Sequence, residues 1–233
     1  MVLELYLDLL SEPCRAVFLF AKKNNIPFMM KSIEMLKGQQ FSEEFNKVII
    51  LRKVPVLKDG DYTLEECTAI LLYLTRKYNT PSHWYPPDMK KRGRVDEYLA
   101  WQHTTIRASA SKILWLKQIP PEKLHDAVED LNLALQKLEE KFLQDRPFII
   151  GTEISLADLV AIVELMQPMG AGWDVFEGRP KLQEWCKRVE VALGKELFME
   201  AHSRILNTQE LRNISIDPPL KAQMKPILLK MLK

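Results

Sequence analysis

A short proline-rich segment divides this chain into two parts whose sequence patterns differ. Residues 79–88 carry Pro81, Pro86 and Pro87, and prolines this close together do not allow a continuous helix. The stretch up to about Tyr78 mixes the periods of strands and helices, whereas the residues beyond these prolines show helical periodicity throughout. In a chain of 233 residues, this change of pattern predicts two domains joined by a linker.

The first part begins with the pattern of a βαβ unit. Leucines alternate with other residues from Leu3 to Leu9, which is the period of two expected of a strand. Pro13 suits the first turn of a helix. From Cys14 the residues are nearly all apolar until the two lysines that end at Lys23, which predicts a helix packed against the sheet. Phe28–Ile33 is predicted to be a second strand, parallel to the first with a right-handed crossover.

A hairpin and a further helix complete the first part. Val54–Leu57 and Tyr62–Leu64 flank Lys58–Asp61, whose Asp-Gly pair is typical of a tight turn between antiparallel strands. A helix is predicted from about Glu66 to Tyr78. The order β-α-β-α-β-β-α favours a thioredoxin-like module, although this order by itself leaves other α/β folds open.

The second part carries apolar stripes at helical spacing. One stripe consists of Leu124, Val128, Leu131, Leu135, Leu138 and Phe142, and another of Leu182, Trp185, Cys186 and Val189. Each stripe predicts a helix with one buried face. Ser155 followed three residues later by Asp158 is a helix capping box, which we assign to folding rather than to catalysis.

Charge and apolar content argue against several classes of function. The 33 basic and 31 acidic residues give a net charge of +2 and are spread along the chain, so no field favours nucleic acid. The sequence shows no long uncharged apolar run of the kind that spans a membrane. The amino terminus has no basic leader ahead of an apolar segment, so we expect no secretory signal and a mature chain that begins at Met1.

Cysteines and histidines give no metal-binding pattern. Cys14, Cys67 and Cys186 are too widely spaced for a zinc site or a disulfide framework, and free cysteines favour a reducing, cytoplasmic compartment. The four histidines lie singly, and we interpret all of them as structural or surface residues. Glycine-rich nucleotide-binding motifs are absent from the sequence as well.

Three points in the first part are predicted to meet at one end of the sheet. Ser11 follows the first strand and precedes a helix, whose positive end can steady an anion, although position alone favours a simple N-cap. Val54–Pro55 opens a strand where proline removes a ladder donor, which predicts a special turn such as a cis bond, with backbone groups left for a ligand. Glu66–Cys67 opens a helix whose free N–H groups suit a carboxylate.

Four blocks of sequence carry a family resemblance. They read L-E-L-Y-L-D-L-L-S-E-P-C-R-A-V, K-V-P-V-L-K-D-G-D-Y-T-L-E-E-C-T-A-I-L-L-Y-L, D-E-Y-L-A-W-Q-H-T and I-S-L-A-D-L-V-A-I. These blocks resemble the theta-class glutathione transferases over nearly the whole chain. The resemblance implies a homodimer that adds the glutathione thiolate to small hydrophobic electrophiles such as alkyl halides, epoxides and peroxides. Glutathione is then the co-substrate, and no cofactor or metal is implied.

The resemblance also implies how the chain is organised. Residues 1–78 would form a thioredoxin-like, glutathione-binding domain, residues 79–88 the linker, and residues 89–233 an all-α domain with the electrophile pocket. An apolar stripe from Leu220 to Met231 would form a lid helix over the active site. A membrane-surface helix is the less favoured interpretation of this stripe, because Pro226 interrupts it.

Two residues receive catalytic roles from the resemblance. Ser11 would donate a hydrogen bond to the glutathione sulfur, because lowering a thiol pKa of about 8.5 by roughly two units takes about 2.7 kcal/mol, within reach of charge-assisted hydrogen bonds. Arg107 would stabilise negative charge developing on a leaving group, whereas without the family it would be interpreted as a solvated helix arginine. The implied glutathione-binding residues are Gln40, Lys53, Val54, Pro55, Glu66, Cys67 and Thr104.

The chain departs from the family pattern at several of these positions. Cys67 stands where serine is usual, Gln40 where histidine is frequent, and Ile49–Ile50 where an asparagine-proline pair is usual. The segment Leu116–Leu124, which helps to wall the electrophile pocket, is shorter than in typical relatives. The sequence therefore leaves the electrophile unnamed and the strength of the activity open.

Two alternative functions remain at this point. Cys14 lies three residues after Ser11 at a helix start, which lowers thiol pKa values, so a glutaredoxin-like thiol oxidoreductase is one alternative. Its apolar neighbours favour a buried packing cysteine instead. The other alternative, suggested by the departures at Gln40, Cys67 and Ile49–Ile50, is a binding protein that keeps the fold with weak or no turnover.

Overall fold

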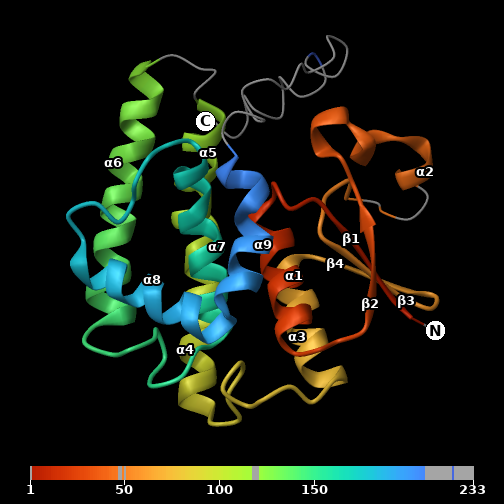
Figure 1. Ribbon diagram of the computed structural model, residues 1–233, viewed down its shortest axis with the longest axis horizontal. Coiled ribbons are helices and arrows are strands. Elements are labelled where there is room, and N and C mark those ends of the chain that lie inside the picture. The colour runs from red at the N-terminus through yellow and green to blue at the C-terminus, as the bar shows by residue number, and fades with distance from the viewer. Residues whose placement is uncertain (1, 47–48, 50, 117–120, 208–221, 223–233) are drawn as a thin grey trace.

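The computed structural model describes residues 2–46, 49, 51–116, 121–207 and 222. The first part of the chain forms a four-stranded sheet with helices packed against it (Figure 1). Its elements are β1 (Leu3–Leu7), α1 (Glu12–Lys23), β2 (Phe28–Ser32), the 3-10 turns η1 (Met35–Lys37) and η2 (Gln39–Phe41), α2 (Glu43–Asn46), β3 (Val56–Asp59), β4 (Tyr62–Glu65) and α3 (Cys67–Lys77).

The strands lie in the order β2-β1-β3-β4. Strand β1 pairs parallel with β2, with Leu5 opposite Met30, and antiparallel with β3, with Leu5 opposite Leu57. Strands β3 and β4 form the hairpin. The predicted βαβ unit, hairpin and thioredoxin-like fold class are confirmed, because the parallel pair, the crossover helix and the antiparallel hairpin are all present.

The first strand is shorter than its leucine pattern predicts. Strand β1 ends at Leu7 instead of reaching Leu9, because the carboxylate of Asp8 accepts a hydrogen bond from the backbone N–H of Leu10 at 2.9 Å and turns the chain. A second bond, from the N–H of Ser11 to the carbonyl of Asp8, closes this turn at 2.9 Å. Asp side chains commonly bond to nearby backbone N–H groups in this way, and the bond here ends the strand earlier than the leucine pattern predicts.

The hairpin turn is tighter than predicted. Lys58 and Asp59 belong to β3, and Asp59 lies opposite Tyr62, so the turn consists of Gly60 and Asp61 alone. Gly60 has a φ of 67°, a left-handed conformation that glycine adopts without steric cost. The other end of β3 is also shifted, because the strand begins at Val56 rather than at the predicted Val54.

Every regular element described after Lys77 is a helix. These elements are α4 (Met89–Thr104), α5 (Ile106–Leu116), α6 (Pro121–Lys137), the π-helical turn η3 (Leu138–Leu143), α7 (Leu156–Gly170), α8 (Pro180–Leu193) and α9 (Lys195–Leu206). No helix in the described ranges has the length and apolar character needed to cross a membrane. The domain boundaries at residues 78 and 88 stay a prediction.

The helices follow the predicted stripes and cap. The stripe that begins at Leu124 runs along α6 and continues into η3, and the second stripe forms one face of α8. Ser155 and Asp158 form the predicted capping box at the start of α7. The predicted lid helix lies outside the described residues apart from Ala222, and so do residues 117–120 of the shortened segment before Leu124.

A buried arginine joins the turn after β1 to the helical part. Arg15 on α1 is fully buried, and its Nη1 donates to the carbonyls of Leu9 and Leu10 at 2.9 and 3.1 Å. Its Nη2 donates to the carbonyl of Val163 at 2.8 Å and to Gln167 Oε1 at 2.5 Å, both on α7. Helix α1 is therefore held between the sheet and helices α7 and α9 (Figure 1).

Helices α7 and α9 pack closely at Gly170, which has no side chain. A Cβ atom at Gly170 would lie 2.5 Å from both the carbonyl oxygen and Cγ1 of Ile205, so a larger residue would force the helices apart. We expect Gly170→Ala to lower the free energy of unfolding by about 3 kcal/mol, as overpacking does. Urea unfolding measures this. In the control Gly93→Ala, where a Cβ meets nothing within 4 Å, we expect α4 to gain about 1 kcal/mol, and equal effects of the two variants would contradict the prediction.

A buried histidine makes the free energy of unfolding depend on pH below 6.5. His202 on α9 is buried, its Nδ1 donates to the carbonyl of Phe198 at 2.8 Å, and its Nε2 has no partner among the described residues. Burial, together with the charge of Arg15, lowers the pKa of His202 from 6.5 to about 3. The unfolded chain therefore takes up a proton below pH 6.5 that the folded chain does not, and stability falls as pH falls from 6.5 towards 3.

The predicted size of this acid effect follows from the shift. Two pH units below 6.5, at pH 4.5, protonation of the unfolded state costs about 2.7 kcal/mol. We expect His202→Gln, which keeps a donor for the Phe198 carbonyl, to lose about that much less stability than the parent chain between pH 7 and pH 4.5. Urea unfolding at both pH values tests this, and parallel losses in the two proteins would show that His202 titrates normally.

Candidate functional site

One cavity gathers most of the predicted site residues. It measures about 200 Å³ and is lined by Pro13, Leu51, Lys53, Val54, Pro55, Glu65, Glu66, Cys67, His103 and Arg107. Six of the nine predicted residues are therefore brought together, namely Lys53, Val54, Pro55, Glu66, Cys67 and Arg107. They come from the approach to β3, the start of α3 and the start of α5.

Ser11 does not line this cavity. It is the N-cap residue of α1, with φ −83° and ψ 126°, and its side chain makes no capping hydrogen bond. The residue is 8% exposed, and Pro13, two positions further along, lines the cavity. The N-cap position predicted from sequence is thus correct, but the hydroxyl is not used to cap the helix.

Two other predicted residues do not line the cavity. Thr104 is exposed at the end of α4, next to His103. Gln40 lies in η2 and is buried, and its side-chain oxygen has no partner among the described residues. Their predicted contacts with a ligand stay predictions.

Two unusual backbone conformations shape one wall of the cavity. The peptide bond between Val54 and Pro55 is cis, so the special turn predicted from the sequence is present, just before the first paired residue of β3. Glu66, the N-cap of α3, has φ 70° and ψ 116°, which is strained for a residue other than glycine and typical of functional sites. The helix then starts at Cys67, whose N–H belongs to the first turn and has no intrahelical acceptor.

The thiol of Cys67 is directed at the backbone of Pro13 on α1. Its Sγ donates to the backbone carbonyl of Pro13 at 3.5 Å and is buried. Burial raises the pKa of Cys67 to about 12, more than the charge of Arg107 lowers it. The side chain therefore joins α3 to α1 as a neutral thiol.

Arg107 is not a solvated helix arginine. Its side chain is only 17% exposed, and its Nε donates to Oε1 of Glu164 on α7 at 2.9 Å. Nη1 lies 3.1 Å from Nδ1 of His103. Burial and the neighbouring Arg107 lower the pKa of His103, so a neutral imidazole accepts this hydrogen bond.

His103 is a site residue that the sequence interpretation missed. It is exposed, in line with the expectation of a structural or surface residue, but it also lines the cavity and contacts Arg107. His103 lies four residues before Arg107, but the two residues stand on either side of the break at Thr105, so helical spacing alone does not predict their contact.

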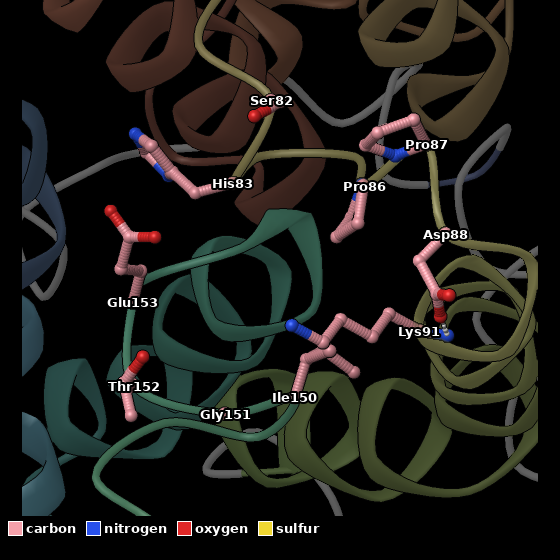
Figure 2. A pocket seen from close by; sticks show the side chains of 10 residues that line it. All are labelled: Ser82, His83, Pro86, Pro87, Asp88, Lys91, Ile150, Gly151, Thr152 and Glu153. Atoms are coloured by element: carbon pink, nitrogen blue, oxygen red, sulfur yellow. Dashed lines mark hydrogen bonds between the residues drawn. The ribbon is translucent and has the colours of Figure 1, made fainter.

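A second cavity, of about 230 Å³, lies elsewhere. Figure 2 shows it between the linker, which supplies Ser82 and His83, and the loop ahead of α7, which supplies Thr152 and Glu153. None of the predicted site residues lines it. His83 is engaged by a contact of 2.6 Å between its Nδ1 and the carbonyl of Ile154, which ties the linker to that loop. The first cavity is therefore the candidate site. The described residues include no group of three or more His, Cys, Asp or Glu that could hold a metal ion.

The chain is similar to known proteins along its whole length. A model of the glutathione S-transferase N-terminal domain matches residues 5–82, and one of the glutathione S-transferase C-terminal domain matches residues 106–191. Glutathione S-transferase theta-1 of Gallus gallus is 57% identical, with 100% of both chains covered. The solved structure of human glutathione-S-transferase T1-1 in its apo form has a TM-score of 0.95 at 53% identity, covering 99% of this chain and 100% of that chain.

A further solved structure holds a glutathione conjugate. It is a human theta-class glutathione transferase in complex with the glutathione conjugate of 1-menaphthyl sulfate, 46% identical to this chain. Its TM-score is 0.95, and the match covers 99% of this chain and 100% of that one.

The buried cysteines are expected to react slowly, because burial raises their thiol pKa values. Burial raises the pKa of Cys14 well above its ordinary value, outweighing the Asp8 backbone and the Ser11 hydroxyl, which lower it. Burial also raises the pKa of the partly exposed Cys186 to about 11. Because only the thiolate is nucleophilic, we expect iodoacetamide at pH 8 to modify Cys14 and Cys67 at least ~100-fold more slowly than in the unfolded chain. Peptide mass spectrometry measures each rate, and rapid modification of Cys14 in the native protein would favour a glutaredoxin-like function.

Proposed function

The chain belongs to the glutathione S-transferase family, in its theta class, and we propose that it uses the described cavity to conjugate glutathione to small hydrophobic electrophiles. Alkyl halides, epoxides and peroxides are the proposed substrate classes. The observation that carries the proposal is the cavity itself, in which Lys53, Arg107, Glu66 and the first turn of α3 meet. Glutathione carries two carboxylates and one ammonium group, and this lining offers a complementary partner to each.

Each part of glutathione is assigned a place. The carboxylate of Glu66 would hold the ammonium of the γ-glutamyl end, and the N–H of Cys67 its carboxylate, as the N-terminus of a helix does. The backbone of Val54 would pair with the cysteinyl unit beside the cis Pro55. Lys53 would face the glycyl carboxylate, with Gln40 and Thr104 as further contacts.

Ser11 is the proposed stabiliser of the thiolate. Its hydroxyl lies at the N-terminus of α1, makes no capping bond and acts on Cys14, whose pKa it lowers. On binding it would donate to the glutathione sulfur instead. The positive end of the helix dipole adds to this stabilisation of an anion. A thiol pKa lowered by about two units needs about 2.7 kcal/mol of differential stabilisation.

Arg107 is the proposed partner of the leaving group. The thiolate sulfur attacks the electrophilic carbon, the bond to the leaving group breaks, and that group departs with the electron pair. A preorganised guanidinium stabilises the charge as it develops and needs no reorganisation in the transition state. In an epoxide the same donor would meet the ring oxygen.

The remaining assignments concern the whole molecule. The helical part would supply the apolar side of the electrophile pocket, and the chain would act as a homodimer in the cytoplasm. A thiol oxidoreductase is disfavoured by the burial of Cys14.

A thiol titration tests the role of Ser11. We expect glutathione bound to the parent protein to titrate about two pKa units below the free thiol, by ultraviolet absorbance of the thiolate, and glutathione bound to Ser11→Ala to return towards about 8.5. The rate of conjugation at pH 7 should then fall roughly 10- to 100-fold, following the thiolate fraction.

The control for this titration is Ser203→Ala. Ser203 is an exposed serine of α9 whose hydroxyl donates to the Glu200 carbonyl, and we expect its replacement to change neither the thiol pKa nor the rate. A normal thiol pKa in the parent protein would contradict the role of Ser11. Glutathione binding without any conjugation would favour the non-catalytic binding protein.

A further inference from the structure

A buried carboxylate stands behind the candidate site. Glu164 lies in the middle of α7 and is 0% exposed. Its Oε1 accepts the hydrogen bond from Arg107 Nε at 2.9 Å, and its Oε2 has no hydrogen-bond partner among the described residues. The pair joins residues that lie 57 positions apart in the chain, so it links α7 to the start of α5.

Packing does not account for a charged residue at this position. Fourteen of the fifteen residues of α7 are buried, and most of them are apolar. A buried ion pair is usually no more stabilising than well-packed apolar side chains, because both charges lose their hydration. Burial raises the pKa of Glu164 to about 8, although the charge of Arg107 and its hydrogen bond lower it.

The pair fixes one end of the guanidinium and leaves the other open. Glu164 engages Nε and His103 engages Nη1, whereas Nη2 has no hydrogen bond to another described residue. Arg107 follows the break between α4 and α5, where Thr105 has φ −116° and ψ −84°, so its backbone lies at the start of α5. Because Nε and Nη1 are both held, the orientation of the guanidinium is fixed, and so is the direction in which Nη2 can donate.

A second carboxylate that acts on Arg107 has a different partner. Glu12 on α1 contributes to the electrostatic field that raises the pKa of Arg107 against its burial. Its carboxylate accepts a hydrogen bond from the hydroxyl of Ser111 on α5. Glu164 is therefore the carboxylate that determines where the guanidinium lies.

We propose that Glu164 is a positioning residue, which holds Arg107 so that its free nitrogen meets the leaving group of the electrophile. This inference rests on the proposed conjugation of glutathione and adds to it a residue that touches neither substrate. A guanidinium that is already in position lowers the free energy of the transition state without having to reorganise. A mobile guanidinium must first be ordered, which costs free energy. The effect of Glu164 therefore falls mainly on kcat and passes entirely through Arg107.

A double-mutant cycle tests the proposal. Conjugation of 1-menaphthyl sulfate, whose leaving group is an anionic sulfate, is measured for the parent protein, Glu164→Gln, Arg107→Ala and the double variant. Glutamine keeps the shape and one acceptor but removes the charge. We expect kcat of Glu164→Gln to fall roughly 10- to 100-fold, as misplaced catalytic groups do, with little change in KM for glutathione. In the Arg107→Ala background we expect the same substitution to change kcat less than about twofold.

A second readout does not depend on turnover. The Nε proton of an arginine bound to a buried carboxylate exchanges slowly with water, so the ¹⁵N-labelled parent protein should show a protected Nε–H signal that is absent from Arg107→Lys. This signal should disappear or exchange much faster in Glu164→Gln. The matched control is Glu139→Gln, which breaks the half-buried Arg179–Glu139 pair and should alter neither the signal nor kcat.

The outcomes separate the inference from the proposed function. A parent protein that conjugates glutathione while Glu164→Gln keeps its kcat, or loses the same factor with and without Arg107, overturns the positioning role and leaves the proposed function intact. A parent protein that binds no glutathione overturns both. A large loss confined to the background with Arg107, together with the loss of the protected signal, supports the positioning role.

Discussion

The guanidinium of Arg15 connects the two parts of this protein at the point where the chemistry is proposed. From α1 it reaches the carbonyls of Leu9 and Leu10 on one side and the carbonyl of Val163 with the amide of Gln167 on the other. Burial lowers its pKa to about 10, so the group remains charged near neutral pH, and a buried charge needs all of these acceptors. The turn before the N-cap of α1 is thereby fixed to α7.

Helix α7 serves as the common reference for both sides of the candidate site. Val163 receives the guanidinium that fixes the turn ahead of Ser11, and the next residue, Glu164, receives the guanidinium of Arg107. The start of the helix is fixed in turn by Asp158, whose carboxylate accepts bonds from the Ile149 backbone and from an indole of α8. The hydroxyl and the guanidinium proposed for catalysis are therefore positioned by neighbouring residues of one buried helix.

Much of the site could be predicted because its parts are local. Val54–Pro55 carries the signature of an unusual bond within two residues, and the start of α3 follows directly from its sequence. Glu164 is different, because a single acid in an apolar helix predicts only that some partner exists. Its contact with Arg107 spans 57 positions, and no short-range pattern indicates such a pairing. His103 was missed for the same reason, since its role depends on where Arg107 is directed.

The sequence by itself determined the order of elements, the parallel unit, the hairpin and the capping box, because periodicity, turn residues and caps act within a few residues of the chain. The family was indicated by the resemblance of four sequence blocks. Tertiary structure decided the state of the ionisable groups. A helix start lowers thiol pKa values, but burial raises those of Cys14 and Cys67 by more, and Arg107 is paired rather than solvated. These outcomes depend on desolvation and on distant partners, which exist only once the helices have packed against the sheet.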